Sequence, residues 1–258
     1  MTIQALVIGI GSGNPDHLTR EAVAALNRAD VFMVADKGAV KHDLVKVREE
    51  LCRHLIEHDR YRFVVVPDPE RGPDRDRDAS AYRVGVATWH DARAQRYADI
   101  IAAEVDDDAT IGFLVWGDPA IYDSTIRIVD SIRDLGVDLE LSVFPGISSM
   151  QLLAARHKII LNRVGQPIHA TTGRRLLDEY SPDLGDVVVM LDGDLACRNL
   201  VDPGVDLLIY WGAQLGLPDE ALVSGRLAEV IDEIQTTREA VRAIRGWVMD
   251  IYLLRPVV

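Results

Sequence analysis

The chain has 258 residues, of which 48% are hydrophobic and 27% charged, a composition typical of a globular protein with one large domain or two smaller ones. Its formal net charge of −13 argues against a nucleic-acid surface, because phosphate binding needs a basic footprint. The first residues do not resemble a signal peptide and no apolar run is long enough to span a bilayer, so we expect a cytoplasmic protein without nucleic-acid or membrane partners. Cys52 and Cys197 lie far apart without Cys-x-x-Cys spacing, which predicts buried free thiols and no metal site.

The first predicted element is an apolar strand over residues 4–10, which leads through a loop with glycines at positions 9, 11 and 13 into a helix capped by Thr19. Alternate glycines let a ligand approach the backbone closely, although a plain tight turn has the same pattern. A dinucleotide-binding unit is an alternative interpretation, but its fingerprint requires a further glycine inside the opening turn of the helix, and this chain has none there. Asn14 and Pro15 delay the helix, so a diphosphate would lack a helix N-terminus.

The next predicted strand, over residues 31–35, ends at Asp36 and Lys37. A carboxylate and an ammonium group at a strand end can move protons or hold a polar ligand, and a salt bridge in a surface turn is the other interpretation. In a nicotinamide-dependent oxidoreductase, Asp36 would instead bind the ribose. Helices over 43–58 and 81–103, with a strand between them, continue the alternation expected of an α/β protein.

The apolar run over residues 111–115 predicts a buried strand, which ends at the Trp-Gly-Asp-Pro segment 116–119. Ligands in open α/β sheets collect outside the carboxyl ends of strands, so residues 117–122 are the first candidate ligand site. We place the junction between two α/β domains here, which predicts domains at residues 1–119 and 120–258.

The second half of the chain continues with strands that open into polar loops. Ser148 and Ser149 stand at a helix start, where hydroxyl groups serve equally well as caps or as ligand contacts. A later loop brings two threonines and two arginines to another helix start, and this group suits carboxylates because guanidinium groups pair with them bidentately. The further elements expected are a helix over 121–135, strands over 139–144, 167–170, 186–191 and 205–210, a helix near 229–234 and a strand over 247–254.

The order of these motifs resembles the tetrapyrrole methylase family, the S-adenosylmethionine (SAM)-dependent enzymes of sirohaem and cobalamin synthesis. The resemblance spans nearly the whole chain and rests on the glycine loop, the Gly-Asp-Pro turn, the Pro-Gly-Ile-Ser-Ser segment 145–149 and the Leu-Gly-Leu-Pro-Asp-Glu segment 215–220. Ser12 departs from the pattern, because many members have proline there. The agreement is longest with members that methylate precorrin-5 and release acetate, over residues 36–38, 89–90, 114–124, 155–157, 161–162 and 171–176.

The resemblance implies two α/β domains of the class III methyltransferase type, with SAM in the cleft between them, and a homodimer. It implies methylation of C-1 of precorrin-5, with S-adenosylhomocysteine and acetate as the other products. The residues at matching cofactor positions are Ser12, Trp116, Gly117, Asp118, Ile121, Ser148, Ser149, Leu191 and Gly212.

Proton transfer and substrate binding complete the implied site. Asp36 matches the position of a proposed proton acceptor in relatives and is the first candidate base, with Lys37 beside it; His90, His157 and Tyr122 are weaker candidates. Two alternatives stay open: a precorrin methyltransferase that does not deacetylate, and a non-catalytic SAM- or tetrapyrrole-binding protein. The residues expected to contact the tetrapyrrole substrate are Tyr122, Thr171, Thr172, Arg174 and Arg175.

Overall fold

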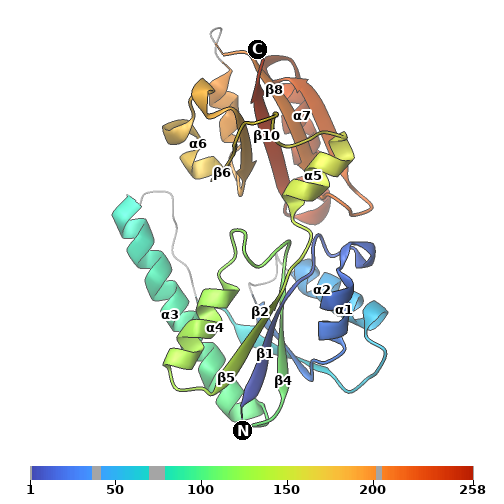
Figure 1. Ribbon diagram of the computed structural model, residues 1–258, viewed down its shortest axis with the longest axis vertical. Coiled ribbons are helices and arrows are strands. Elements are labelled where there is room, and N and C mark those ends of the chain that lie inside the picture. The colour runs from blue at the N-terminus through green and yellow to red at the C-terminus, as the bar shows by residue number, and fades with distance from the viewer. Residues whose placement is uncertain (1, 37–41, 70–78, 202–204, 258) are drawn as a thin grey trace. The chain divides into compact units, whose positions relative to one another are not determined.

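The computed structural model describes residues 2–36, 42–69, 79–201 and 205–257. The chain forms two compact units, residues 1–147 and 148–258, each with its own sheet (Figure 1). This division differs from the boundary that we expected between residues 119 and 120. The reason is that β5 (Leu139–Phe144) pairs in parallel with β1 (Ile3–Gly9), which binds it into the N-terminal sheet.

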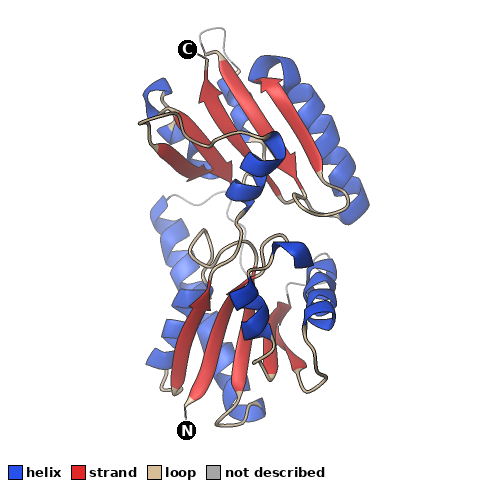
Figure 2. Cartoon of the chain, turned by 45° about the vertical axis from the view of Figure 1, so that its right-hand side comes forward, coloured by secondary structure: helices blue, strands red, loops and turns tan. Residues whose placement is uncertain are grey.

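The N-terminal unit contains a parallel five-stranded sheet with the order β3-β2-β4-β1-β5. Residues 5–8 of β1 are fully buried, as expected for a parallel strand that is covered on both faces. Helices α1 and α2 pack on one face, and α3 and α4 pack on the other (Figure 2). The remaining elements of this unit are β2 (Val31–Asp36), β3 (Arg62–Pro67), β4 (Thr110–Val115), α1 (Arg20–Leu26), α2 (His42–Leu55), α3 (Ala79–Glu104) and α4 (Thr125–Asp134).

Local signals in the sequence account for several of these boundaries. The Thr19 hydroxyl oxygen accepts a hydrogen bond from the backbone N of Ala22 at 3.0 Å, which confirms the predicted N-cap of α1. Asn14 and Pro15 form a short 3₁₀ turn before it, so the helix begins only at Arg20. Both cysteines are buried and free, as predicted.

The C-terminal unit contains a mixed five-stranded sheet with the order β6-β7-β10-β8-β9. Strand β6 is parallel to β7, whereas β10 is antiparallel to both β7 and β8. Helices α6 and α7 share a core with one face of the sheet, and α5 contacts β8 and β10. The elements are α5 (Ser149–His157), β6 (Ile168–Thr172), α6 (Gly173–Glu179), β7 (Asp186–Met190), β8 (Leu207–Ala213), β9 (Ala221–Arg226), α7 (Leu227–Arg245) and β10 (Asp250–Pro256).

Strand β9 was not predicted from the sequence, and α7 is longer than the helix expected near residues 229–234. The strand lies at the edge of the sheet and buries only Val223, so its apolar pattern is weak. Within the described ranges, no helix combines the length and the apolar character needed to cross a bilayer.

Candidate functional site

The first candidate edge is the carboxyl edge of the N-terminal sheet, within its own unit. Strands β1 and β4 are neighbours, and the loops that follow them lead to α1 on one face and to α4 on the other. Such a divergence of adjacent loops is the topological switch point at which α/β sheets bind ligands. The glycine loop after β1 and the Gly-Asp-Pro turn after β4 therefore meet at the position where a ligand is expected.

Backbone contacts join three loops at this edge. Gly11 and Gly117 form an isolated antiparallel bridge, in which the N of Gly117 donates to the O of Gly11 at 2.7 Å. A Cβ atom on Gly146, in the loop after β5, would lie 2.1 Å from the O of Gly117, and one on Gly9 would lie 2.6 Å from the N of Gly146. Glycine is thus required at positions 9 and 146, because the backbones of these loops approach one another too closely for a side chain.

The Asp118 side chain holds the loops after β4 and β5 together. Its Oδ2 accepts a hydrogen bond from the N of Gly146 at 2.9 Å, and its Oδ1 accepts one from the N of Ala120 at 2.8 Å. The N of Ile121 donates to the backbone O of Asp118 at 3.1 Å. Both carboxylate oxygens therefore stabilise the turn. Tyr122, at the same turn, adopts a left-handed backbone with φ 51° and is exposed.

Trp116 packs inside the N-terminal unit. A Cβ atom on Gly13 would lie 2.8 Å from Cζ3 of the Trp116 ring, and the Arg48 guanidinium carbon lies 4.9 Å from the ring centroid. The Trp116 ring therefore packs against the glycine loop at Gly13. Its Nε1 is buried and has no hydrogen-bond partner among the described residues. Ser12, in the same loop, lies with its Oγ 3.3 Å from Nδ1 of His17.

Arg48 is a residue that the sequence interpretation missed. Its Nε donates to the backbone O of Leu114 at 3.3 Å, which places the guanidinium group near the end of β4. Burial lowers the pKa of Arg48 to about 10, and Tyr97 and Asp123 partly oppose this shift. The available signal was an arginine four residues after Leu44, on the apolar stripe of the predicted helix.

Asp36 is the last residue of β2 and lies in register with Pro67. Strand β2 is parallel to its neighbours β3 and β4, so Asp36 belongs to the same carboxyl edge as the glycine loops. Lys37, its predicted partner, lies outside the described residues. His90 is on α3 with its ring 5.2 Å from that of Trp89.

The second candidate edge is the carboxyl edge of the C-terminal sheet, within its own unit. Strands β6, β7 and β8 run in the same direction, because β6 is parallel to β7 and both β7 and β8 are antiparallel to β10. Their ends bring the segment 171–175, Leu191 and Gly212 to one edge. Ser148 and Ser149 stand at the start of α5; Ser148 is buried and its Oγ lies 2.5 Å from Oε1 of Gln151.

A buried polar network supports the loop after β7. The Tyr252 hydroxyl donates to Oδ2 of Asp192 at 2.5 Å, and Arg238 Nη2 donates to the backbone O of Asp192 at 2.8 Å. Arg238 Nε also donates to Asp250 Oδ2 at 2.7 Å. The network anchors Asp192, the residue that follows Leu191. Leu191 itself has a left-handed backbone with φ 53°, and its side chain is 66% exposed.

The predicted substrate loop is partly occupied by its own contacts. Thr171 is buried and donates to Oε2 of Glu179 at 2.6 Å, and Arg175 pairs with the same carboxylate. The hydrogen bond from Thr171 is the largest cause that lowers the pKa of Glu179, and the hydrogen bond from Arg175 is the next largest. Thr172 is half-buried and Arg174 is exposed. His157, the last residue of α5, lies with its Nε2 2.9 Å from the O of Trp211 in β8.

Gln214, directly after β8, is a second residue that the sequence interpretation missed. It is 1% exposed, its backbone is left-handed with φ 52°, and neither its Oε1 nor its Nε2 has a hydrogen-bond partner among the described residues. Such groups are rare in folded proteins and require an explanation.

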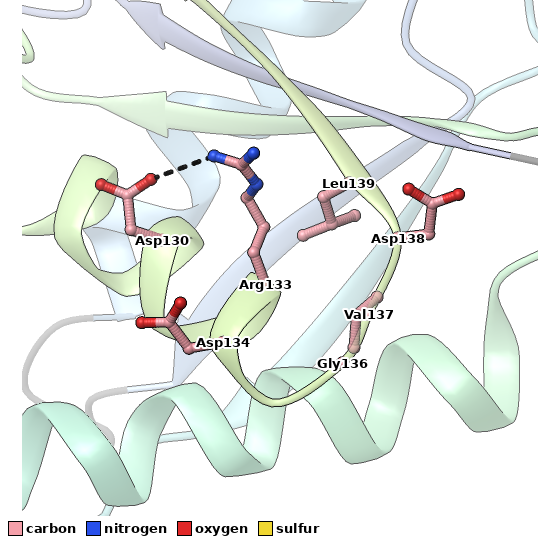
Figure 3. Close-up of a pocket in the computed structure, with 7 residues that line it drawn as sticks. All are labelled: Asp130, Arg133, Asp134, Gly136, Val137, Asp138 and Leu139. Carbon is pink, nitrogen blue, oxygen red and sulfur yellow. Dashed lines mark ion pairs between the residues drawn. The ribbon is translucent and has the colours of Figure 1, made fainter.

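A separate pocket lies between the end of α4 and the start of β5 (Figure 3). It is lined by Asp130, Asp134, Asp138 and Arg133, and Arg133 pairs with Asp130 at 3.6 Å. This is the amino end of β5, whereas the glycine turns lie at the carboxyl end. None of the predicted site residues contributes to this pocket.

The fold and the motifs define a family. Residues 5–231 match the model of the Tetrapyrrole (Corrin/Porphyrin) Methylases, and the chain belongs to this family. The predicted class of two α/β domains is thereby confirmed. The chain is 46% identical over 251 residues to the precorrin-6A synthase [deacetylating] of Sinorhizobium sp, covering 97% of this chain and 94% of the relative.

Two further comparisons extend this result. The crystal structure of a cobalamin synthesis related protein (CobF) from Corynebacterium diphtheriae superposes with a TM-score of 0.83 and 34% identity, covering 100% of both chains. The precorrin-2 C(20)-methyltransferase of Sinorhizobium sp is 29% identical over 180 residues, covering 66% of this chain and 68% of the relative.

Proposed function

We propose that the protein is a SAM-dependent C-methyltransferase of cobalamin biosynthesis that methylates precorrin-5 at C-1 and releases acetate to give precorrin-6A. The observation that carries this proposal is the 46% identity, over 97% of the chain, to the precorrin-6A synthase of Sinorhizobium sp. The match extends over 97% of the chain and therefore includes residues of both units.

The chemistry of the residues fits a cofactor of this kind. Trp116 Nε1 and the Gln214 amide are buried side-chain groups without partners among the described residues, as expected where a ligand completes the bonding. The groups proposed to hold SAM are Ser12, Trp116, Gly117, Asp118, Ile121, Ser148, Ser149, Leu191 and Gly212. When bound, SAM supplies an electrophilic methyl group.

The protein's own contribution to methyl transfer is chiefly positioning. Holding a nucleophile in line with the group that it attacks is worth up to about 7–11 kcal/mol in favourable intramolecular analogues. Both Asp118 carboxylate oxygens already accept backbone hydrogen bonds, so we propose that this turn offers its backbone groups to the cofactor. The side chain would keep those groups in place.

Deacetylation also requires a water nucleophile and proton transfer, for which a positioned base contributes about 10²- to 10⁴-fold. We propose Asp36 as this base and Lys37 as the cation that stabilises a developing enolate or carboxylate. The acidic protein repels a polycarboxylate substrate as a whole, so local cations must offset this field. Arg174 and Arg175 are proposed for that role, with Tyr122, Thr171 and Thr172 as further substrate contacts.

The family resemblance also supports a homodimer, and the sequence supports a cytoplasmic location.

A second candidate function is methylation of another precorrin without deacetylation, which the similarity to a precorrin-2 C(20)-methyltransferase supports at the lower identity of 29%. The sharpest test is incubation with precorrin-5 and SAM labelled in the methyl group, followed by mass analysis of the tetrapyrrole and an acetate assay. Labelled product with stoichiometric acetate supports the proposal, and no methyl gain on precorrin-5 contradicts it. Methyl gain without acetate in a parallel incubation with precorrin-2 favours the second candidate.

A further inference from the structure

The Gln214 side chain carries an inference beyond the residues proposed above. Its backbone groups are partnered, because its N donates to the O of Met249 at 2.9 Å and its O accepts from the N of Leu217 at 3.0 Å. Its carboxamide is not, although the residue is 1% exposed. Among the described residues, it is the single side chain with two polar atoms that are both buried without partners.

This arrangement is costly in the protein alone. A buried amide without hydrogen bonds loses its hydration without compensation, and a left-handed backbone at a residue other than glycine adds strain. The backbone contacts to Met249 and Leu217 hold the residue in place despite this cost. Both features occur where β8 ends, at the edge shared by Leu191 and the loop at 171–175.

We infer that the Gln214 carboxamide binds the cofactor of the proposed reaction, through a ligand edge that presents a hydrogen-bond donor beside an acceptor. This inference rests on the proposed function. Ionised carboxylates of a tetrapyrrole offer acceptors alone and would leave Oε1 unpartnered. SAM carries two suitable groups, the amino and ring nitrogens of adenine and the ammonium and carboxylate of its amino-acid end.

The position of Gln214 supports a cofactor contact rather than a purely structural role. Gly212, two residues earlier on β8, is a proposed cofactor position, and a Cβ atom there would lie 2.7 Å from Cδ2 of Leu215 and 3.2 Å from Cδ1 of Leu153. A buried amide favours one defined orientation of the ligand, because no water competes for its hydrogen bonds. Gln214 would thus select the cofactor by complementarity of donor and acceptor.

The test uses the full-length protein and calorimetric titration with S-adenosylhomocysteine. Gln214→Met keeps the length of the side chain and removes both polar groups, and Gln235→Met, at a half-buried glutamine on α7 whose amide is bonded to Arg198 and Glu239, is the matched control. We expect Gln214→Met to bind at least about tenfold more weakly, the loss of one to two hydrogen bonds, while Gln235→Met binds like the wild type. The unliganded Gln214→Met protein should melt at the wild-type temperature or above, because an unpartnered amide has been removed.

Titration with 5′-methylthioadenosine, which lacks the amino-acid end, identifies the group that is bound. A similar loss of affinity for both ligands in Gln214→Met assigns the amide to adenine, and a loss for S-adenosylhomocysteine alone assigns it to the amino-acid end. Unchanged affinity for both ligands, or a clear destabilisation of the unliganded variant, would overturn the inference. A wild-type protein that binds neither ligand would instead refute the proposed function itself.

Discussion

Gly11 and Gly117 exchange two backbone hydrogen bonds, from the N of Gly117 to the O of Gly11 at 2.7 Å and from the N of Gly11 to the O of Gly117 at 3.2 Å. The two residues belong to loops that leave neighbouring strands toward opposite faces of the sheet. Both have left-handed backbones, with φ 58° and 66°, which glycine adopts without strain. A ligand at this edge therefore meets a backbone surface that is already rigid.

Gly146→Ala should destabilise the protein strongly. The new methyl carbon would lie 2.1 Å from the O of Gly117, and this neighbour is backbone that cannot rotate away. We expect a loss of about 3 kcal/mol in the free energy of unfolding, at the upper end of typical overpacking costs, measured by urea denaturation. Gly193→Ala is the control, because no atom lies within 4 Å of its Cβ position. Equal stability of the two variants would contradict the close crossing of the loops after β4 and β5.

The two thiols should make stability fall at high pH. Burial is the main cause that raises the pKa of Cys52 and of Cys197 from the ordinary 9.0 to about 12. The unfolded chain therefore releases these protons first. The contribution is fully present below about pH 9 and is lost as the pH rises to about 12, by about 1.4 kcal/mol per pH unit and thiol.

Urea denaturation between about pH 8 and 10 measures this loss, and the Cys52→Ala/Cys197→Ala variant should lose less stability over the same range. Tyr97, whose pKa burial also raises to about 12, contributes in the same direction in both proteins. Rapid reaction of the native wild type with a thiol reagent at about pH 8 would show that the thiols are accessible and would refute the explanation.

Asp36→Asn should retain cofactor binding and lose most turnover. The substitution keeps the size of the side chain and removes the carboxylate proposed as base, so a loss of about 10²- to 10⁴-fold in acetate release is expected. Calorimetric titration with S-adenosylhomocysteine is the control for cofactor binding. Full activity of this variant would remove Asp36 from the mechanism.

Arg174→Glu should weaken binding of the tetrapyrrole, and the effect should be larger at low salt because screening weakens charge interactions between exposed groups. Fluorescence titration with a tetrapyrrole polycarboxylate measures this affinity. Arg133→Glu makes the same change in net charge at the amino end of β5 and should have little effect. If both variants bind alike, the attraction comes from net charge and Arg174 has no specific role.

The alternation of strands and helices, the cap at Thr19 and the burial of both cysteines could be predicted from the sequence, because each depends on local periodicity, on one side chain or on composition. The motifs at residues 9–13, 116–119 and 145–149 likewise indicated the family that the comparison confirms. Strand β9 could not be predicted in this way, because an exposed edge strand has little apolar pattern to detect.

By itself, the sequence determined the class of fold and the family, and it predicted the loops of the candidate site. Only the tertiary structure decided where the units divide, because the pairing of β5 with β1 joins segments that are distant in the chain. It also decided that Gly146 serves the crossing of two loops, that the Thr171 hydroxyl is bound to Glu179 and that the Gln214 amide is buried without a partner among the described residues. Each of these facts depends on which atoms of distant segments come within contact distance, and local sequence patterns do not encode that distance.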